Sequence, residues 1–224
     1  MDHQPGSRIP AKKKLRDRLI GLTSQHPDWV IGFQDEVWWS RYAQPHLHSW
    51  SPDGKPLRLV EQVAKGKDDT PKALACYGIL LRHCPQQAEQ WVEEMWLRFV
   101  DGRPISGITT QFLQWCCEKL AQKGKRVLIL VWDNARWHIS RAVQQWIRAQ
   151  NQTCLKTGKG TRIFVCPLPI KSPWLNPIEP KWVHGKRRIV QPDRTLSPDE
   201  LEERVCAALA CPHEDHLSIS ENVS

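Results

Sequence analysis

The sequence predicts an α/β fold in which helices cover both faces of one mixed sheet. Strand-like segments come first in the chain, and helix-like and strand-like segments alternate after them. Early strand-like segments that are joined by turns indicate antiparallel pairing. Residues 126–133 (RVLILVWD) are apolar on both faces, which is typical of a central parallel strand that helices cover on each side.

The first half of the chain is expected to supply the antiparallel part of the sheet. Residues 1–10 are expected to be disordered, and residues 11–25 to form a short basic helix. Asp53 and Gly54 mark a turn between two extended pieces. The strand-like segments are residues 29–39, in which apolar residues alternate, residues 71–81 and residues 95–100.

The second half is expected to alternate helices with strands. Ser197 suits an N-cap, and Pro198 and Glu200 suit the first turn that follows it. Residues 151–160 (NQTCLKTGKG) are polar and contain glycine, so a surface loop is expected there. The predicted helices are residues 106–122, 135–150, 179–189 and 198–209, and the predicted strands are residues 126–133 and 162–166.

The composition limits the class of protein. Of the 224 residues, 40% are apolar and 25% are charged, so the chain can bury one principal core and is not wholly disordered. A net charge of +8 favours polyanionic partners. No apolar run is long enough to span a bilayer, and the start lacks a signal-peptide core. A cytoplasmic protein without a membrane partner is therefore expected.

The eight cysteines are scattered through apolar segments and are expected to be reduced. The nearest approach to a zinc pattern is Cys206, Cys211, His213 and His216. Cys206 falls inside a predicted helix, and no Cys-x-x-Cys pair exists. A zinc site is therefore the less favoured interpretation of these residues.

Three carboxylates occupy positions that suggest chemistry. Asp35 lies on the apolar face of its predicted strand, where a charge is costly unless it is paired or binds a metal; a partner arginine or a solvent-exposed strand end is an equal alternative. Asp133 ends a buried strand at the carboxyl edge of the sheet, although it or Asn134 could instead cap the next helix. Glu179 follows a proline-rich turn that fixes its position, although Asn176 and Glu179 also fit an ordinary helix start.

If these three carboxylates meet, they can hold two divalent cations. Two hard cations roughly 4 Å apart activate the attacking water or 3′-hydroxyl of a phosphodiester reaction and stabilise the leaving oxygen. Mg²⁺ prefers oxygen ligands and keeps several waters, so a few carboxylates suffice. Asp35, Asp133 and Glu179 are therefore candidate ligands for phosphodiester chemistry.

Three sequence blocks resemble the DDE superfamily of transposases, in particular mariner-like elements and related bacterial insertion-sequence enzymes. The blocks are FQDEVWWSR around Asp35, LILVWDNARWHIS around Asp133 and PLPIKSPWLNPIEPKW around Glu179. They occur in the order that the family has, and the resemblance covers about residues 11–210. It implies a ribonuclease H-like (retroviral-integrase-like) fold, a mixed five-stranded sheet flanked by helices.

The resemblance also implies the chemistry of the site. Asp35, Asp133 and Glu179 would be the metal ligands and catalytic residues, with two Mg²⁺ ions or Mn²⁺ as a substitute. The supporting residues would be Asn134, His138 and Asn176. The implied activity is DNA strand cleavage and strand transfer during transposition of an insertion sequence, by a homodimer that holds paired transposon ends and a target DNA.

Two features depart from the family pattern. The 45 residues between Asp133 and Glu179 are more than is usual, and we attribute the excess to the loop expected at residues 151–160. The 34 residues before Asp35 are too few for the helix-turn-helix domains that usually precede it, so a split or truncated element with a separate helix-turn-helix protein is expected. The expected organisation is a basic segment (1–25), the catalytic domain (26–210) and a C-terminal tail (211–224).

The basic residues that follow Glu179 are candidates for DNA contact, and a solvated basic face is the alternative. They are Lys181, Lys186, Arg187 and Arg188. Most of the 12 tryptophans are expected in the core, with Trp137, Trp174 and Trp182 as the better candidates for stacking on DNA. Two other functions stay open, namely a host nuclease of the same fold that acts on RNA–DNA hybrids or repair intermediates, and a non-catalytic DNA-binding remnant.

Overall fold

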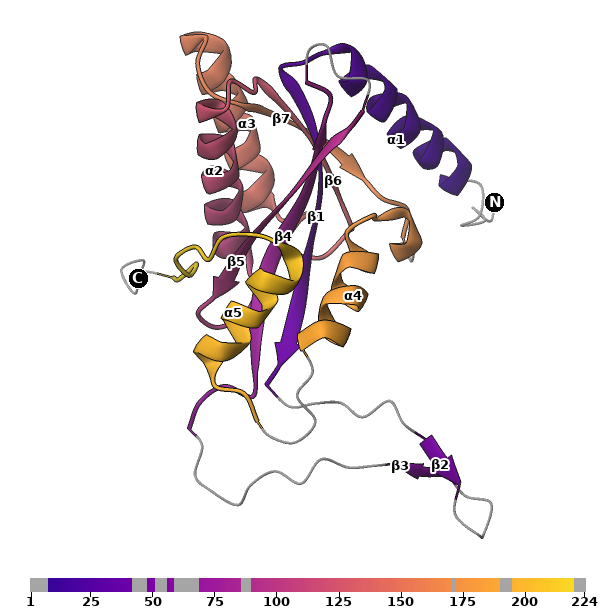
Figure 1. Cartoon of the computed structure of the whole chain (residues 1–224). Helices are drawn as coiled ribbons and strands as arrows, with labels where there is room; N and C mark the ends of the chain where they lie inside the picture. Colours follow the sequence, from indigo (N-terminus) through magenta and orange to yellow (C-terminus); the bar gives the residue numbers. More distant parts are fainter. Residues whose placement is uncertain are drawn as a thin grey trace.

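A five-stranded sheet with helices on both faces forms the centre of the protein, as a computed structural model shows (Figure 1). The structure describes residues 8–41, 48–50, 56–58, 69–85, 90–170, 172–189 and 195–219. The elements in chain order are α1 (Arg8–Gln25), β1 (Trp29–Ser40), β2 (His48–Trp50), β3 (Pro56–Arg58), β4 (Ala73–His83), β5 (Val92–Val100), α2 (Ser106–Gln122), β6 (Val127–Trp132), α3 (Arg141–Thr157), β7 (Arg162–Pro167), the 3₁₀ turn η2 (Pro173–Leu175), α4 (Glu179–Ile189) and α5 (Pro198–Leu209).

The strands of the central sheet follow the order β5-β4-β1-β6-β7. β4 pairs antiparallel with both β1 and β5, whereas β6 pairs parallel with both β1 and β7. The mixed five-stranded sheet that the sequence predicts is therefore confirmed. β2 and β3 form a separate antiparallel pair, and the turn expected at Asp53 and Gly54 lies outside the described residues.

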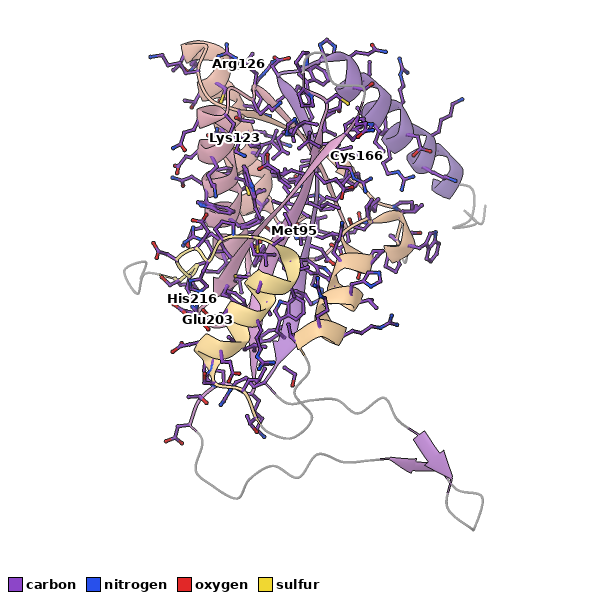
Figure 2. The ribbon with its side chains drawn as sticks, in the orientation of Figure 1. Met95, Lys123, Arg126, Cys166, Glu203 and His216 are labelled. Carbon is purple, nitrogen blue, oxygen red and sulfur yellow. The ribbon has the colours of Figure 1, made fainter. Side chains whose placement is uncertain are left out.

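Apolar side chains form one core on each face of the sheet (Figure 2). The first core contains Phe33 and Trp39 of β1 and lies under α1, α4 and α5. The second contains Val30 of β1 and lies under α2 and α3. β1 contributes to both because successive side chains of a strand point to opposite faces. The strand predicted at residues 29–39 is thus confirmed, but it is covered on both faces rather than having the single apolar face that the alternation predicted.

α3 differs from the predicted helix at both ends. It begins at Arg141 rather than at residue 135, because Ser140 is its N-cap and accepts a hydrogen bond from the amide of Val143. It continues to Thr157 and ends at Gly158, whose φ of 65° suits a glycine cap. The surface loop expected at residues 151–160 is therefore wrong. Residues 151–157, to which the long spacing between the second and third candidate carboxylates was attributed, belong instead to the last turns of α3.

Both ends of the described chain are attached to the sheet. Residues 8–10, which were expected to be disordered, belong to α1, and residues 1–7 lie outside the described part. Near the other end, the amide of Leu217 donates to the carbonyl of Phe99, and its carbonyl accepts from the amide of Asp101. Within the described residues, none of the helices has the length and apolar character needed to cross a membrane.

Candidate active site

Asp35, Asp133 and Glu179 border a single cavity of about 240 Å³. Phe33 of β1 lies opposite Val131 of the parallel strand β6, so Asp35 and Asp133, each two residues further on, reach the same level of the sheet. Glu179 is the first residue of α4, which follows the turn that leads back from β7. The structure therefore brings the three predicted carboxylates to one place from three elements.

A buried histidine holds Asp133. Oδ1 of Asp133 accepts a hydrogen bond from the amide of Ala135 at 2.9 Å and lies 2.8 Å from Nδ1 of His138. The other ring nitrogen of His138, Nε2, lies 2.8 Å from Oε1 of Glu36. The imidazole is 1% exposed and stacks on Trp132 with the ring centroids 4.4 Å apart. His138 therefore links the carboxylate of Asp133 to that of Glu36.

The two carboxylates keep this imidazole charged. Burial lowers the pKa of His138, but its bonds to Asp133 and Glu36 outweigh burial and raise the pKa to about 9. The bond from His138 in turn lowers the pKa of Asp133. At neutral pH, both ring nitrogens thus donate, and Asp133 is ionised.

Asn134 joins the ends of β6 and β7. Its side-chain nitrogen donates to the carbonyl of Leu168 at 2.7 Å, and the amide of Leu168 donates to the carbonyl of Trp132 at 2.8 Å. Because α3 begins only at Arg141, neither Asp133 nor Asn134 caps it. The alternative interpretation of these two residues as a helix cap is therefore wrong.

Asp35 is held by a tryptophan of α4. Nε1 of Trp182 donates to Oδ2 of Asp35 at 2.9 Å, and its ring packs edge-on against Trp39, with centroids 5.9 Å apart. The ring reaches Asp35 because Gly78 lies opposite Asp35 on β4, where a Cβ would come within 2.8 Å of the Trp182 ring carbon Cζ2. Trp182 is 3% exposed, so its expected stacking on DNA is wrong and its contact with Asp35 takes that place.

The glycine opposite Asp35 supplies a test of this packing. Gly78→Ala is expected to displace the Trp182 ring, lower the free energy of unfolding by about 1–3 kcal/mol and impair any activity that depends on Asp35. Urea denaturation measures the change in the free energy of unfolding. Gly107→Ala is the matched control, because a Cβ at Gly107 meets no atom within 4 Å. Equal stability of the two variants would contradict the proposed close contact.

The turn before α4 is anchored to β1 and α1. The side-chain nitrogen of Asn176 donates to the carbonyl of Gln34, next to Asp35, at 3.2 Å. The guanidinium of Arg16 donates to the carbonyl of Leu175 at 2.8 Å. The amide of Glu179 bonds to the backbone carbonyl of Asn176 and not to its side chain, so the helix cap considered for Asn176 is not formed.

Burial and neighbouring negative charge disfavour the ionised forms of Asp35 and Glu179. Burial raises the pKa of Asp35 from 3.8 to about 7, and the negative charge of Glu179 contributes to this shift. Burial, followed by the charge of Asp133, raises the pKa of Glu179. Among the described residues that line the cavity, none is lysine or arginine. Such a concentration of carboxylates favours binding of a cation.

The donor atoms fit hard divalent cations. Carboxylate and amide oxygens are the ligands that Mg²⁺ and Mn²⁺ prefer, and Oδ1 of Asn176, on the cavity wall, is buried without a hydrogen-bond partner among the described residues. The ligand oxygens of Asp35, Asp133 and Glu179 do not all lie within 4.8 Å of one another. Two ions about 4 Å apart, each about 2.1 Å from its ligands, span oxygens as far as about 8 Å apart.

The basic residues expected to contact DNA lie on α4, the helix whose first residue, Glu179, borders the cavity. Lys186 and Arg187 are exposed. The ammonium of Lys181 lies 3.2 Å from Glu93, and Arg188 donates to a backbone carbonyl of α5. No hydrogen bond or ion pair within the protein is described for Lys186 or Arg187, unlike for the other two basic residues.

The sequence located the three carboxylates, and the resemblance named Asn134, His138 and Asn176 as supporting residues, which make contacts at the site. The contacts of Glu36 and Trp182 were missed. Neighbouring side chains of a strand point to opposite faces, so Glu36 points away from Asp35, and nothing in the sequence links it to His138. Trp182 reaches Asp35 only because Gly78 leaves room for its ring. Like the contact between Glu36 and His138, this contact joins residues that are far apart in the sequence. Of the other tryptophans considered for DNA contact, Trp174 is 70% exposed next to the cavity.

Comparisons with known proteins agree with this geometry. The sequence profile of the DDE superfamily endonuclease family matches residues 30–202. The Mos1 transposase paired-end complex with left transposon end has a similar fold (TM-score 0.59, 17% identity), over 95% of this chain and 56% of that chain. The catalytic domain of Mos1 mariner transposase is also similar (TM-score 0.53, 15% identity), over 94% of this chain and 85% of that one.

These likenesses confirm the ribonuclease H-like fold that the sequence resemblance implied. The chain spans about half the length of the transposase chain in the paired-end complex. No curated protein was found to match it by sequence.

Proposed function

The chain belongs to the DDE superfamily of endonucleases, and from this premise we propose that it is the catalytic domain of a transposase. It cleaves DNA strands and transfers them to a target during transposition of an insertion sequence. Residues 26–210 form the catalytic domain in this proposal. The observation that supports it most is the meeting of Asp35, Asp133 and Glu179 at one cavity that lacks a described lysine or arginine.

Asp35, Asp133 and Glu179 are the proposed ligands of two Mg²⁺ ions, with Mn²⁺ as a substitute. When bound, the ions supply activation of the attacking hydroxyl and stabilisation of the leaving oxygen. Paired-end complexes of Mos1 with Mn and with Mg have the same fold as this chain, at 16% and 18% identity. The donor atoms of the cavity suit either ion.

The other residues of the site position these ligands. His138 fixes the side chain of Asp133 through Nδ1 and shares its second proton with Glu36. Trp182 orients Asp35 through its indole N–H. Asn176 ties the turn before Glu179 to β1, and its free Oδ1 suits a metal-bound water. Because metal ligands act only when rigidly placed, these contacts prepare the site for its ions.

The proposed partners are DNA and a second copy of the chain. Lys186 and Arg187, which are exposed on α4, supply charge for phosphate contacts near the cavity. The Mos1 complexes are described as a paired-end complex, a strand transfer complex and a pre-cleavage transpososome. By analogy, we propose that this chain acts as a homodimer on paired ends. The proposed location is the bacterial cytosol or nucleoid.

Metal-dependent cleavage tests the proposal directly. The purified chain is incubated with DNA that carries its terminal repeats and with Mg²⁺ or Mn²⁺, and product strands are resolved on a denaturing gel. We expect nicking and strand transfer that EDTA and Asp133→Ala both abolish. Equal cleavage by Asp133→Ala would indicate a contaminant and exclude Asp133 from the reaction.

Two further measurements separate the alternatives. Faster cleavage of RNA–DNA hybrids than of transposon ends would favour a host nuclease. Metal-independent DNA binding that weakens steeply with salt, without any product, would favour a non-catalytic remnant.

A further inference from the structure

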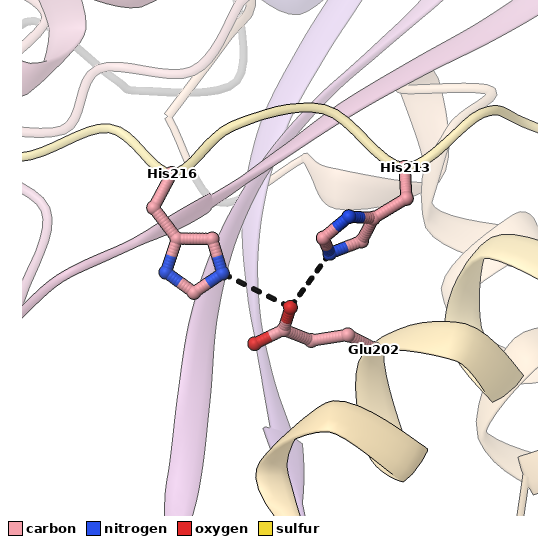
Figure 3. Close-up of side chains that lie close together, drawn as sticks. All are labelled: Glu202, His213 and His216. Carbon is pink, nitrogen blue, oxygen red and sulfur yellow. Dashed lines mark hydrogen bonds and ion pairs between the residues drawn. The ribbon is translucent and has the colours of Figure 1, made fainter.

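We propose that Glu202, His213 and His216 form a second metal site, which binds a transition-metal dication such as Zn²⁺. Glu202 belongs to α5, and the two histidines belong to the segment that follows this helix (Figure 3). The site joins α5 to the C-terminal segment and is separate from the cavity of Asp35, Asp133 and Glu179. It is independent of the proposed function.

The ligand atoms converge on one point. Oε2 of Glu202 lies 2.7 Å from Nε2 of His213 and 3.0 Å from Nε2 of His216 (Figure 3). All three ligand atoms lie within 4.8 Å of one another, and this is the only such group among the described residues. Nitrogen ligands about 2.0–2.1 Å from a tetrahedral zinc ion are roughly 3.3 Å apart, so the group needs to open by only a few tenths of an ångström.

The buried carboxylate of Glu202 requires a positive charge. Its side chain is 7% exposed, and its described ion-pair partners are the two imidazoles alone. An unpaired carboxylate in such a position is costly, and an imidazole counts as a cation only when it is protonated. A bound dication supplies the charge and leaves both imidazoles neutral, which is the form that binds metal.

A second carboxylate orients one of the imidazoles. Nδ1 of His216 lies 2.7 Å from Oδ1 of Asp101, so this nitrogen carries a proton, and with a metal bound the deprotonated Nε2 would present its lone pair to the ion beside Glu202. A carboxylate behind a histidine is the usual arrangement around zinc. The ring of Phe99 contacts both imidazoles, with centroid distances of 6.2 and 5.8 Å, and limits their rotation.

The surroundings allow a metal to enter and to remain. The side chain of His213 is 51% exposed, whereas that of His216 is 28% exposed. Arg98 donates to the carbonyls of Asp215 and His216, which fixes the segment that carries the ligands. Imidazole ligands select zinc-like metals over Mg²⁺, so the two sites of the protein differ in the ion that they prefer.

The sequence pattern contained two of the three residues of this site. Cys206, Cys211, His213 and His216 were weighed as a zinc pattern and disfavoured. The structure pairs the two histidines with Glu202 instead, one turn before Cys206 on α5. Neither cysteine belongs to the group of three ligand atoms.

Zinc binding by the full chain tests the inference. Protein stripped with EDTA is titrated with Zn²⁺ against a chromophoric chelator, in excess Mg²⁺ so that the carboxylate cavity is saturated. We expect one tight equivalent, which His213→Ala weakens at least about 100-fold. Asp101→Asn is expected to weaken it about 10- to 100-fold, as is typical of a carboxylate behind a metal-bound histidine.

The matched control is His184→Ala, which removes an exposed histidine of α4 and is expected to leave zinc affinity unchanged. Zinc should also raise the melting temperature of the wild type but not of His213→Ala, because only the folded wild type binds it. Since His213 is half exposed, its variant keeps the fold, as circular dichroism checks. No tight equivalent in the wild type, or the same affinity in His213→Ala, would overturn the site.

Discussion

Replacing Asp35 with asparagine is expected to stabilise the metal-free protein while it removes at least about 99% of the cleavage activity. Burial, and then the charge of Glu179, raise the pKa of Asp35 from 3.8 to about 7. Above that pH the site holds a charge that the fold disfavours when no cation is bound. Asparagine has nearly the same shape and no charge, so it relieves this cost but binds metal poorly.

The pH dependence follows from the direction of the shift. A carboxyl group whose folded pKa is raised stabilises the fold below its unfolded pKa, and this contribution is lost as the pH rises through about 7. By about pH 8, ionisation of Asp35 has lowered the free energy of unfolding of the wild type by at most about 4 kcal/mol, whereas the variant has no such loss. Between about pH 5.5 and pH 8, the difference should widen by about 2 kcal/mol.

Urea denaturation in EDTA at these two pH values measures the effect, and Asp69→Asn provides the control because Asp69 is exposed. Adding Mg²⁺ should raise the stability of the wild type more than that of Asp35→Asn, since ligand binding favours the folded state. If Asp35→Asn were less stable than the wild type at the higher pH, the charge of Asp35 would be stabilised by a partner in the metal-free protein, and the prediction would be wrong.

Three helices were predicted with the bounds that the structure shows, although Ile105 before α2 makes no side-chain cap. The predicted bounds of α2, α4 and α5 agree with the structure, and Ser197 caps α5 as expected. α3 was misplaced because the residues around His138 form a turn that holds Asp133 by tertiary contacts. Its last turns were mistaken for a loop because a helix that faces solvent on one side has the polar composition of a loop.

The sequence could predict only the three carboxylates of the candidate site, from the strands that carry Asp35 and Asp133 and from the turn before Glu179. A parallel pair of strands places Asp35 and Asp133 at one level whatever surrounds them. The contacts between His138 and Glu36 and between Trp182 and Asp35 cross 102 and 147 residues of sequence. Neither the periodicity of the sequence nor its local spacing can predict these contacts, because they depend on how α4 and the turn after β6 pack on the sheet.

Replacing His138 with glutamine is expected to cost about 3–5 kcal/mol of stability near neutral pH and to release Asp133 from its position. The glutamine amide carries no positive charge. The carboxylate of Glu36, whose side chain is 8% exposed, therefore loses the imidazolium that neutralises it. The exposed His184→Gln is the control. Equal loss of stability in both variants would show that the buried bridge contributes nothing specific.

The pH dependence distinguishes this bridge from simple packing. Burial lowers the pKa of His138, but the bonds to Asp133 and Glu36 raise it to about 9 in the folded protein. The stabilisation is therefore complete below the unfolded pKa of about 6.5 and is lost as the pH rises through about 9. The gap in unfolding free energy between wild type and His138→Gln should narrow from about pH 7 to about pH 10, whereas a gap that stays constant would assign the loss to packing against Trp132.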